Sequence, residues 1–170
     1  MAYILDSNTL ITAKNLYYAY DIVPSFWSIL LTEFHKGTVK IIDAVESEIL
    51  QGNDNLSKWM RDNICEKFAA NGEAYVLPSK NSQDIVSCFQ TIASNVVSNQ
   101  QFKDNYKRIF LSGADPWLIA TAKTNGHTVV TFEEMPPATT TKVKIPAICR
   151  QMGVACDNLY EMMRKLNIKI

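Results

Sequence analysis

Short apolar runs alternate along the chain with longer stretches in which apolar residues recur at every third or fourth position. The short runs are residues 3–5, 38–42, 75–77, 128–131 and 154–156. Their length and apolar character predict buried strands, and the stretches between them have the spacing of amphipathic helices. Strands that take turns with helices predict a parallel sheet covered on both faces, which is an α/β fold. In such a sheet, ligands bind beyond the carboxyl ends of the strands.

Several of the predicted helices have recognisable ends. Pro24 opens a helix that Gly37 closes, which follows the preference for Pro at the start and Gly after the end. Asp43 and Glu46 are three positions apart and fit a capping box at the start of another helix. Residues 6–9 form a polar turn that leads from the first strand into a helix. The other predicted helices are residues 54–70, 82–100, 102–111, 115–126 and 159–166, with a short one from Pro146.

The composition is that of an ordinary globular protein. Of its 170 residues, 47% are apolar and 20% are charged, which argues against disorder. This length suits one domain, and we expect residues 1–170 to form it. Lys and Arg together number 17, as do Asp and Glu, so the formal net charge is zero. Nucleic acid would therefore have to be bound by a local basic patch or a bound metal ion, not by a globally basic surface.

The cysteines and histidines suggest no catalytic or metal site. His35 and His127 are far apart in sequence, and the four cysteines contain no C-x-x-C pair. An acid already occurs at Asp6, too early for the core of a signal peptide, and no apolar run approaches the length of a membrane span. We expect a cytoplasmic protein without a membrane segment. Its cysteines are expected to act as small apolar residues; they are Cys65, Cys88, Cys149 and Cys156.

Four acidic residues are placed to meet at one edge of the predicted sheet. Asp6 and Glu133 follow strands, whereas Glu48 and Asp115 lie on helices that are entered from the same edge. Several carboxylates can share a pocket when a cation offsets their repulsion. A site of carboxylate oxygens without His or Cys suits Mg²⁺ or Mn²⁺. Such ions can promote in-line displacement at phosphorus.

The segments around these acids resemble the four motifs of PIN domains. Residues 3–11 (YILDSNTLI) resemble the opening strand and its Asp, and residues 45–49 (VESEI) resemble the second motif. Residues 113–122 (GADPWLIATA) are similar to the third, and residues 129–133 (VVTFE) to the fourth. The ADPWLIA version of the third motif resembles one PIN-like subgroup near the VapC-type toxins. The resemblance spans residues 3–133, most of the chain.

The resemblance implies a PIN-like three-layer α/β/α fold with a central, mainly parallel sheet of about four or five strands. It implies a divalent-metal-dependent endoribonuclease that hydrolyses RNA phosphodiester bonds and leaves 5′-phosphate and 3′-hydroxyl ends. Asp6, Glu48 and Asp115 would be catalytic and hold an Mg²⁺ or Mn²⁺ ion, and Glu133 would help to hold a second ion. A toxin role, a small antitoxin partner that blocks the site, and a homodimer are implied as well.

The sequence departs from the PIN pattern in two places. The fourth acid is Glu133, where the family usually has Asp, and Glu134 beside it is an alternative. The helical insertion between Glu48 and Asp115 is longer than in the smallest members of the family. The first departure keeps a second function open, a non-catalytic PIN-like module that binds RNA or protein.

Structural roles compete with the catalytic ones at several positions. Asp115 before a proline is a good helix N-cap, and Asp6 could close a turn. Glu46 competes with Glu48 for the site, since two helical residues two positions apart point to different faces. Some polar residues could orient site groups or merely form turns, and two lysines could contact RNA phosphates or merely be solvated. These residues are Ser7, Asn8 and Thr131, and Lys142 and Lys144.

Overall fold

Parallel strands form the centre of the structure, a computed structural model that describes residues 1–64, 68–69 and 71–170. The strands are β1 (Tyr3–Leu5), β2 (Val39–Ile42), β3 (Val76–Leu77), β4 (Thr128–Val130) and β5 (Cys156–Asp157). They pair in the order β3-β2-β1-β4-β5, and every pair is parallel. The prediction of a mainly parallel sheet of about four or five strands is therefore confirmed, with five strands that are all parallel.

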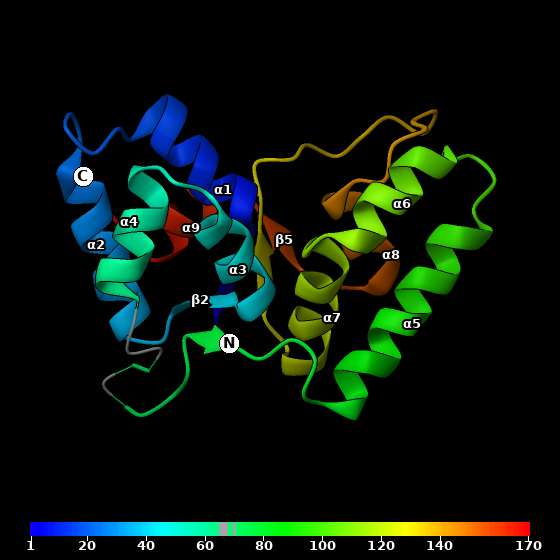
Figure 1. The fold of residues 1–170 in the computed structure, drawn as a ribbon, viewed down its shortest axis with the longest axis horizontal. Coiled ribbons are helices and arrows are strands. Elements are labelled where there is room, and N and C mark those ends of the chain that lie inside the picture. Colours follow the sequence, from blue (N-terminus) through cyan, green and yellow to red (C-terminus); the bar gives the residue numbers. More distant parts are fainter. Residues whose placement is uncertain (65–67, 70) are drawn as a thin grey trace.

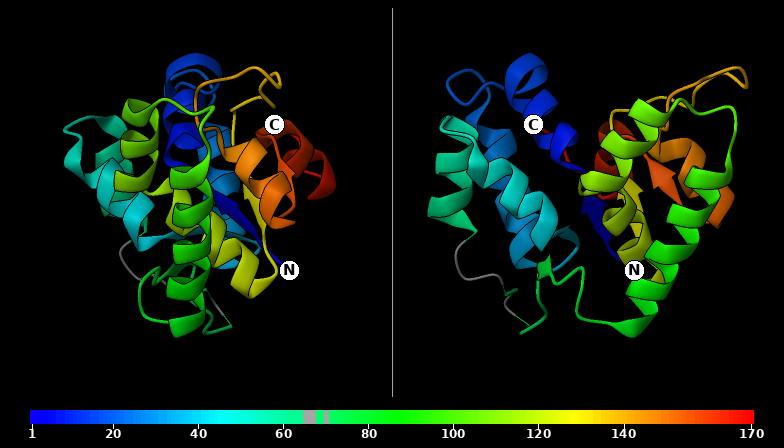
Figure 2. Two further views of the ribbon diagram at one scale, coloured as in Figure 1. Left: turned by 90° about the vertical axis from the view of Figure 1, so that its right-hand side faces the viewer. Right: turned by 45° about the vertical axis from the view of Figure 1, so that its right-hand side comes forward.

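Helices connect the strands and cover both faces of the sheet (Figure 1). The first group is α1 (Ser7–Thr12), a π-helix (Ala13–Tyr17), α2 (Pro24–His35), α3 (Asp43–Gln51) and α4 (Asn55–Asn63). The second group is α5 (Gln83–Ser98), α6 (Asp104–Ser112), α7 (Asp115–Asn125) and α8 (Ile145–Met152). The chain ends in α9 (Leu159–Lys165), which returns to the side of the first group. The right-hand view of Figure 2 shows the same division from another direction.

The strand order changes direction between β1 and β4. The chain runs outward from β1 through β2 to β3 on one side, then crosses over to β4 and β5 on the other. Carboxyl ends of neighbouring strands at such a reversal leave a crevice, because the connections on either side depart in opposite directions. The first residues after β1 and β4 therefore lie at the natural ligand position of this fold.

Burial explains why these short segments form the central strands. All four residues of β2 and all three of β4 are buried, as are Ile4 and Leu5 of β1. A parallel sheet buried on both faces requires such continuous apolar runs. On one face α7 is the central helix, and six of its residues, from Pro116 to Ala122, are buried. Helix α7 packs against α5 and also contacts β2 and β4.

Several local predictions were wrong in instructive ways. The expected polar turn at residues 6–9 is already helical from Ser7, so Asp6 is the residue before the helix. The expected capping box of Asp43 and Glu46 does not form, because the Asp43 carboxylate accepts hydrogen bonds from Ser79 (N, 3.0 Å; Oγ, 2.5 Å). The helix expected over residues 54–70 ends at Asn63, and residues 65–67 and 70 lie outside the described residues, with Cys65 among them.

Candidate active site

Asp6 is the most deeply buried acid of the site. It follows β1 directly, and its backbone N–H donates to Val130 O of β4 at 3.0 Å. Its side chain is fully buried, and Oδ2 accepts a hydrogen bond from Thr131 Oγ1 at 3.0 Å. Burial raises the pKa of Asp6 to about 6, opposed by hydrogen bonds from Thr131 and the Asn8 backbone. A buried acid held in this way is costly unless it has a function or a compensating charge.

Thr131 connects the ends of the two central strands. While its hydroxyl donates to Asp6, the same oxygen accepts the backbone N–H of Glu133 at 3.1 Å. The side chain is buried, so both hydrogen bonds are shielded from water. Thr131 thus orients the Asp6 carboxylate and fixes the start of the following loop. Asn8 contributes through its backbone: its N–H donates a hydrogen bond to Asp6, whereas its side chain is exposed.

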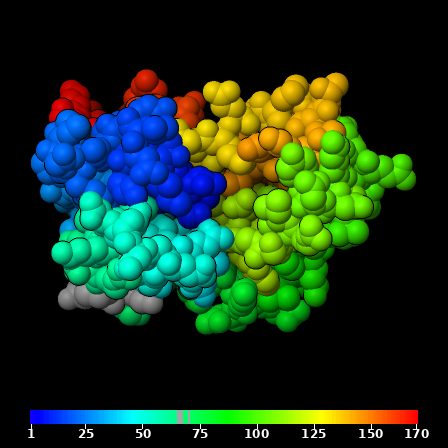
Figure 3. Space-filling model, turned by 45° about the horizontal axis from the view of Figure 1, so that its top comes forward, coloured from blue at the N-terminus to red at the C-terminus, as the bar shows by residue number. Residues whose placement is uncertain are grey.

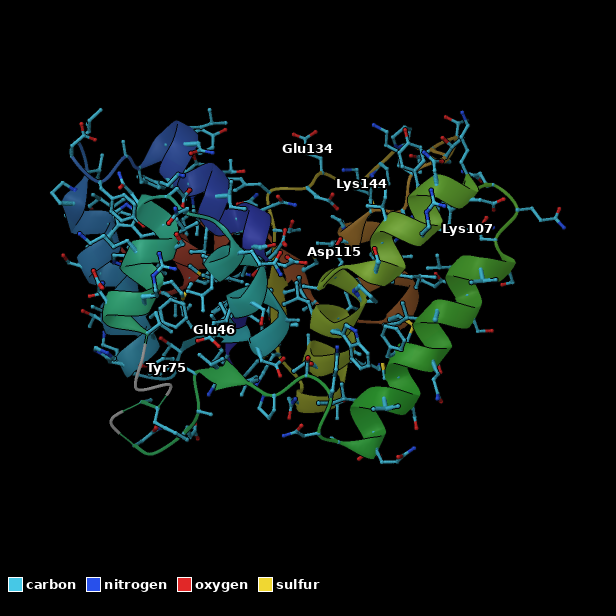
Figure 4. All side chains as sticks on the ribbon, viewed as in Figure 1. Glu46, Tyr75, Lys107, Asp115, Glu134 and Lys144 are labelled. Atoms are coloured by element: carbon cyan, nitrogen blue, oxygen red, sulfur yellow. The ribbon has the colours of Figure 1, made fainter. Side chains whose placement is uncertain are left out.

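Glu48 joins the starts of two helices across the mouth of the site. Its Oε2 accepts from Ser7 Oγ at 2.7 Å, and its Oε1 accepts from the Ala114 backbone N–H at 2.9 Å. Glu48 itself is exposed, so these two bonds fix a carboxylate that solvent can reach. Glu46, the competing acid of the same helix, is buried and lies away from Asp115 in Figure 4. Of the two acids, Glu48 is therefore the one that reaches this site.

Asp115 is the first residue of α7 and does not cap it. The N-cap position is Ala114, and no side chain caps this helix start. Burial, together with the charges of Asp6, Glu133 and Glu48, raises the pKa of Asp115 to about 8, and Lys144 opposes the rise. The charges of three other acids act on Asp115, so the four carboxylates lie within electrostatic reach of one another; they are called the carboxylate cluster below. The alternative role of Asp115 as the N-cap is thus wrong, and its carboxylate makes no capping hydrogen bond.

Glu133 is held by the segment that follows it. Its Oε1 forms an ion pair with Lys144 Nζ at 2.7 Å, and its Oε2 accepts from the Ile145 backbone N–H at 2.8 Å. Both oxygens of the fourth acid are therefore engaged within the protein. Glu134 is exposed and, in Figure 4, lies further out than Asp115, with Lys144 between the two. Of the two lysines considered, only Lys144 reaches this cluster, because Lys142 lies over the ring of Tyr106.

The donor atoms of this cluster match a hard divalent cation in kind. Carboxylate oxygens that raise one another's pKa are the groups whose repulsion such an ion relieves. In the described part of the chain, however, no three acidic, His or Cys side chains converge as a ready-made metal site. An ion bound by Asp6, Glu48 and Asp115 would therefore require their side chains to turn toward it.

A cavity of about 750 Å³ adjoins the carboxylate cluster. Thr131 and Glu133 line it, together with aromatic residues from three distant segments: Tyr17, Phe132 and Tyr160. Sequence reasoning missed these residues. Phe132 directly follows Thr131 at the end of a strand, and this position is a weak sequence signal for a site residue. Nothing in the sequence associates Phe132 with the two tyrosines. In Figure 3, the N-terminal segment and α3 lie against the part of the chain around α7 and against the loop that follows β4.

Comparisons with known proteins support this fold. A family model described as "Domain of unknown function (DUF4411)" matches residues 3–170. A chain of VapBC2 from Rickettsia felis, crystallised with a DNA fragment from their promoter, is 13% identical with a TM-score of 0.55, and the alignment covers 93% of this chain and 98% of that chain. A chain of FitAcB from Neisseria gonorrhoeae is 16% identical with a TM-score of 0.51 and the same coverage. No curated protein matches the sequence significantly. These likenesses confirm the PIN-like α/β/α fold.

Proposed function

The chain belongs to the family described as a domain of unknown function, DUF4411, and we propose that it is a divalent-metal-dependent endoribonuclease. One observation carries the proposal. Asp6 and Asp115, on different elements at the reversal of the sheet, have pKa values raised to about 6 and about 8. Strongly perturbed acids gathered at the ligand position of an α/β fold favour a functional site. The PIN-like motifs and the shared fold favour RNA hydrolysis as its function.

Asp6, Glu48 and Asp115 would hold the metal, Mg²⁺ or Mn²⁺, and the bound ion would supply positive charge that activates water and stabilises a phosphodiester under attack. Thr131 holds the Asp6 carboxylate in place through its hydroxyl. Glu48 is oriented by Ser7 and by the Ala114 N–H. Asp115, which is free of a capping role, orients the attacking water and accepts its proton at a carboxylate oxygen.

Lys144 is the basic residue that we propose to contact the RNA backbone. Its ammonium group pairs with Glu133 and lowers the pKa of Asp115, so it lies within electrostatic reach of the carboxylates. A phosphate that approaches these acids needs a nearby cation, because the chain as a whole carries no net charge. Glu133 positions Lys144 and, in this proposal, helps to bind a second ion only after it releases this lysine.

The proposal is tested by incubating a mixed labelled RNA pool with purified protein and Mn²⁺. Asp6→Asn and Asp115→Asn keep the shape of the side chains but remove the charge, so each should reduce cleavage by at least about 100-fold. A chelator should abolish cleavage by the parent protein. Circular dichroism of each variant shows whether folding is retained. Cleavage by a folded Asp115→Asn variant at the rate of the parent would refute the assignment of that residue.

We further propose that the chain is the toxin of a toxin–antitoxin pair, that a small antitoxin blocks the site, and that the chain forms a homodimer. The VapBC2 and FitAcB likenesses support this proposal at the level of the fold. Induced expression should stop growth with the parent sequence and permit growth with Asp115→Asn. Growth arrest by both proteins would show that toxicity does not depend on the carboxylate site. Light scattering on the purified chain gives its mass and tests the dimer directly.

A second function is favoured by one specific observation. Both oxygens of Glu133 are engaged by Lys144 and Ile145, and this arrangement also suits a PIN-like module that binds RNA or protein without cutting. RNA binding that persists in a chelator, without cleavage in any divalent metal, would favour this binding module.

No helix in the described part of the chain is long and apolar enough to cross a membrane.

A further inference from the structure

The cavity beside the carboxylates has a wall in common with the candidate active site. Thr131 hydrogen-bonds to Asp6, and Glu133 pairs with Lys144, and both residues also line the cavity. The remaining wall comes from the segment that follows β4, from β5, from the π-helix and the start of α9, and from one residue each of α1 and α8. At about 750 Å³, the space exceeds what a nucleoside needs. A group bound there would lie directly beside a phosphodiester at the carboxylates.

Three aromatic rings form one side of this cavity. The ring centroids of Tyr17 and Phe132 are 5.3 Å apart, and Tyr160 is 5.9 Å from each of them. Tyr17 is 47% exposed, although its side chain is large and apolar over most of its surface. The three rings belong to elements that are far apart in the sequence, so the fold alone brings them together. Partly exposed aromatic faces are the surfaces on which unpaired nucleobases stack.

The polar part of the wall is rich in hydrogen-bond acceptors, and two of its four acids are already paired with a cation. Asp157 pairs with Lys165 at 2.6 Å, and Glu133 pairs with Lys144 at 2.7 Å. Glu161 accepts a hydrogen bond from the Asn158 backbone N–H at 2.8 Å. Glu134 lies at the exposed rim, and no partner for it is found among the described residues. The carboxylate oxygens of Glu134 and Glu161, which have no cation partner in the part of the chain that the structure describes, suit a bound group that offers N–H donors.

We propose that this cavity binds a nucleobase of single-stranded RNA next to the cleaved phosphodiester, and that it prefers guanine. Guanine presents two adjacent donors, N1–H and the N2 amino group, which a carboxylate accepts together. In this arrangement the base stacks on Tyr17, Tyr160 lies at an angle of 75° to Tyr17 and borders the base, and the donor edge of the base faces Glu134 at the rim. The inference rests on the proposed function, since it names the substrate feature that the same site selects.

The proposal is tested by titrating the ¹⁵N-labelled full-length chain with each of the four ribonucleoside 5′-monophosphates in the presence of a chelator. Amide signals of residues 131–134 and 156–161 should shift on binding. GMP should bind at least about 5-fold more tightly than AMP, CMP or UMP, which is the lower end of the discrimination from a bidentate contact. Because no metal is present, this readout does not depend on cleavage.

Matched variants separate stacking from base preference. Tyr17→Ala should weaken GMP binding by about 5- to 100-fold, whereas Tyr17→Phe, which keeps the ring, should bind as the parent does. Glu134→Gln should remove most of the preference for GMP over AMP while stacking is retained. Glu134 is exposed, so this change should leave folding intact. Equal loss of binding in the Ala and Phe variants would contradict stacking at Tyr17.

The outcomes distinguish this inference from the proposed nuclease activity. Cleavage of RNA by a protein whose cavity amides respond to none of the nucleotides would overturn the base-binding cavity and leave the nuclease. Selective GMP binding without cleavage in any divalent metal would support the cavity and refute the nuclease. Equal binding of all four nucleotides would overturn the guanine preference. If argininamide moves these amides and nucleotides do not, the cavity takes a cationic partner side chain, and the proposal is wrong.

Discussion

Thr131 donates a 3.0 Å hydrogen bond to Asp6 across the ends of two neighbouring parallel strands, and so ties the buried acid to the loop that carries Glu133. The bond joins residues 125 positions apart in the sequence. It lies at the reversal of the strand order, where the fold leaves its crevice. The Asp6 carboxylate is therefore oriented by the residue that directly follows β4, at the edge of the sheet.

Replacing Thr131 by Val should destabilise the protein and raise the pKa of Asp6 above its value of about 6. The variant keeps the shape but leaves Asp6 and the Glu133 N–H without their partner in a buried place, which costs about 1–3 kcal/mol. The pKa rises because the Thr131 hydrogen bond lowers it in the parent. Urea denaturation gives the stability, and ¹³C NMR of the carboxyl group gives the pKa. Thr131→Ser should retain most of both properties, and an unchanged Asp6 pKa in the Val variant would contradict the role of this hydroxyl.

The metal-free protein should lose stability as pH rises from about 4 to about 8. The folded-state pKa values of Asp6 and Asp115 lie above the ordinary value of 3.8, so within this window the folded state binds more protons than the unfolded state. Stability is then greatest below the unfolded pKa and falls as pH rises through the folded pKa values. Asp115→Asn removes one of these groups, so its stability relative to the parent should increase across the same window. Melting temperatures in a chelator check this, at about 2–4 °C for each kcal/mol in a chain of this size.

The control for this pH dependence is Asp62→Asn, an exposed acid on α4. Its effect relative to the parent should be the same at pH 5 and at pH 8. An Asp115→Asn variant that behaves like this control would show that the folded protein does not raise the pKa of Asp115.

Divalent metal should reverse the destabilisation at pH 8. An ion that binds the folded carboxylates stabilises by mass action, by about 2.7 kcal/mol at 100 times its dissociation constant. We expect Mn²⁺ to raise the melting temperature of the parent protein at pH 8 by several degrees, and to do much less for Asp115→Asn, because that variant has lost one of the charges. An equal rise in both proteins would place the ion elsewhere.

Two substitutions of Glu48 separate the structural role of its hydrogen bonds from the role of its charge. Glu48→Ala leaves the buried Ala114 N–H without an acceptor and leaves the Ser7 hydroxyl only Asp6 Oδ1, at 3.5 Å, so we expect a loss of about 1–3 kcal/mol. Glu48→Gln keeps a carbonyl oxygen for Ala114 and an amide group for Ser7, so its stability should stay near that of the parent. Both variants should lose cleavage, because both lack the negative charge. Full activity of the Gln variant would limit Glu48 to holding the two helix starts together.

The sequence predicts the scaffold of this site better than its contacts. Apolar runs and the rule for parallel sheets place Asp6 and Glu133 at one edge of the sheet. The structure agrees, because burial determines which apolar segments form the central strands that these acids follow. The bond from Ala114 to Glu48 spans 66 positions and depends on where the fold places the start of α7 relative to α3, which no local pattern records. Local capping rules were wrong at Asp43 for a similar reason, since a tertiary partner, Ser79, competes successfully for the carboxylate.

Lys144 should contribute to RNA binding in a way that salt reveals. Each phosphate contact on a single strand adds about 0.7 to the slope of log binding constant against log salt concentration, because a bound counterion is released. Lys144→Met should therefore weaken binding of a single-stranded RNA and reduce this slope by about 0.7, measured in a chelator by fluorescence anisotropy. The matched control is Lys36→Met, because Lys36 lies at the end of α2, just before β2 and so at the opposite edge of the sheet. Equal slopes for the Lys144 variant and the parent would exclude a phosphate contact by Lys144 and leave its pairing with Glu133 as its role.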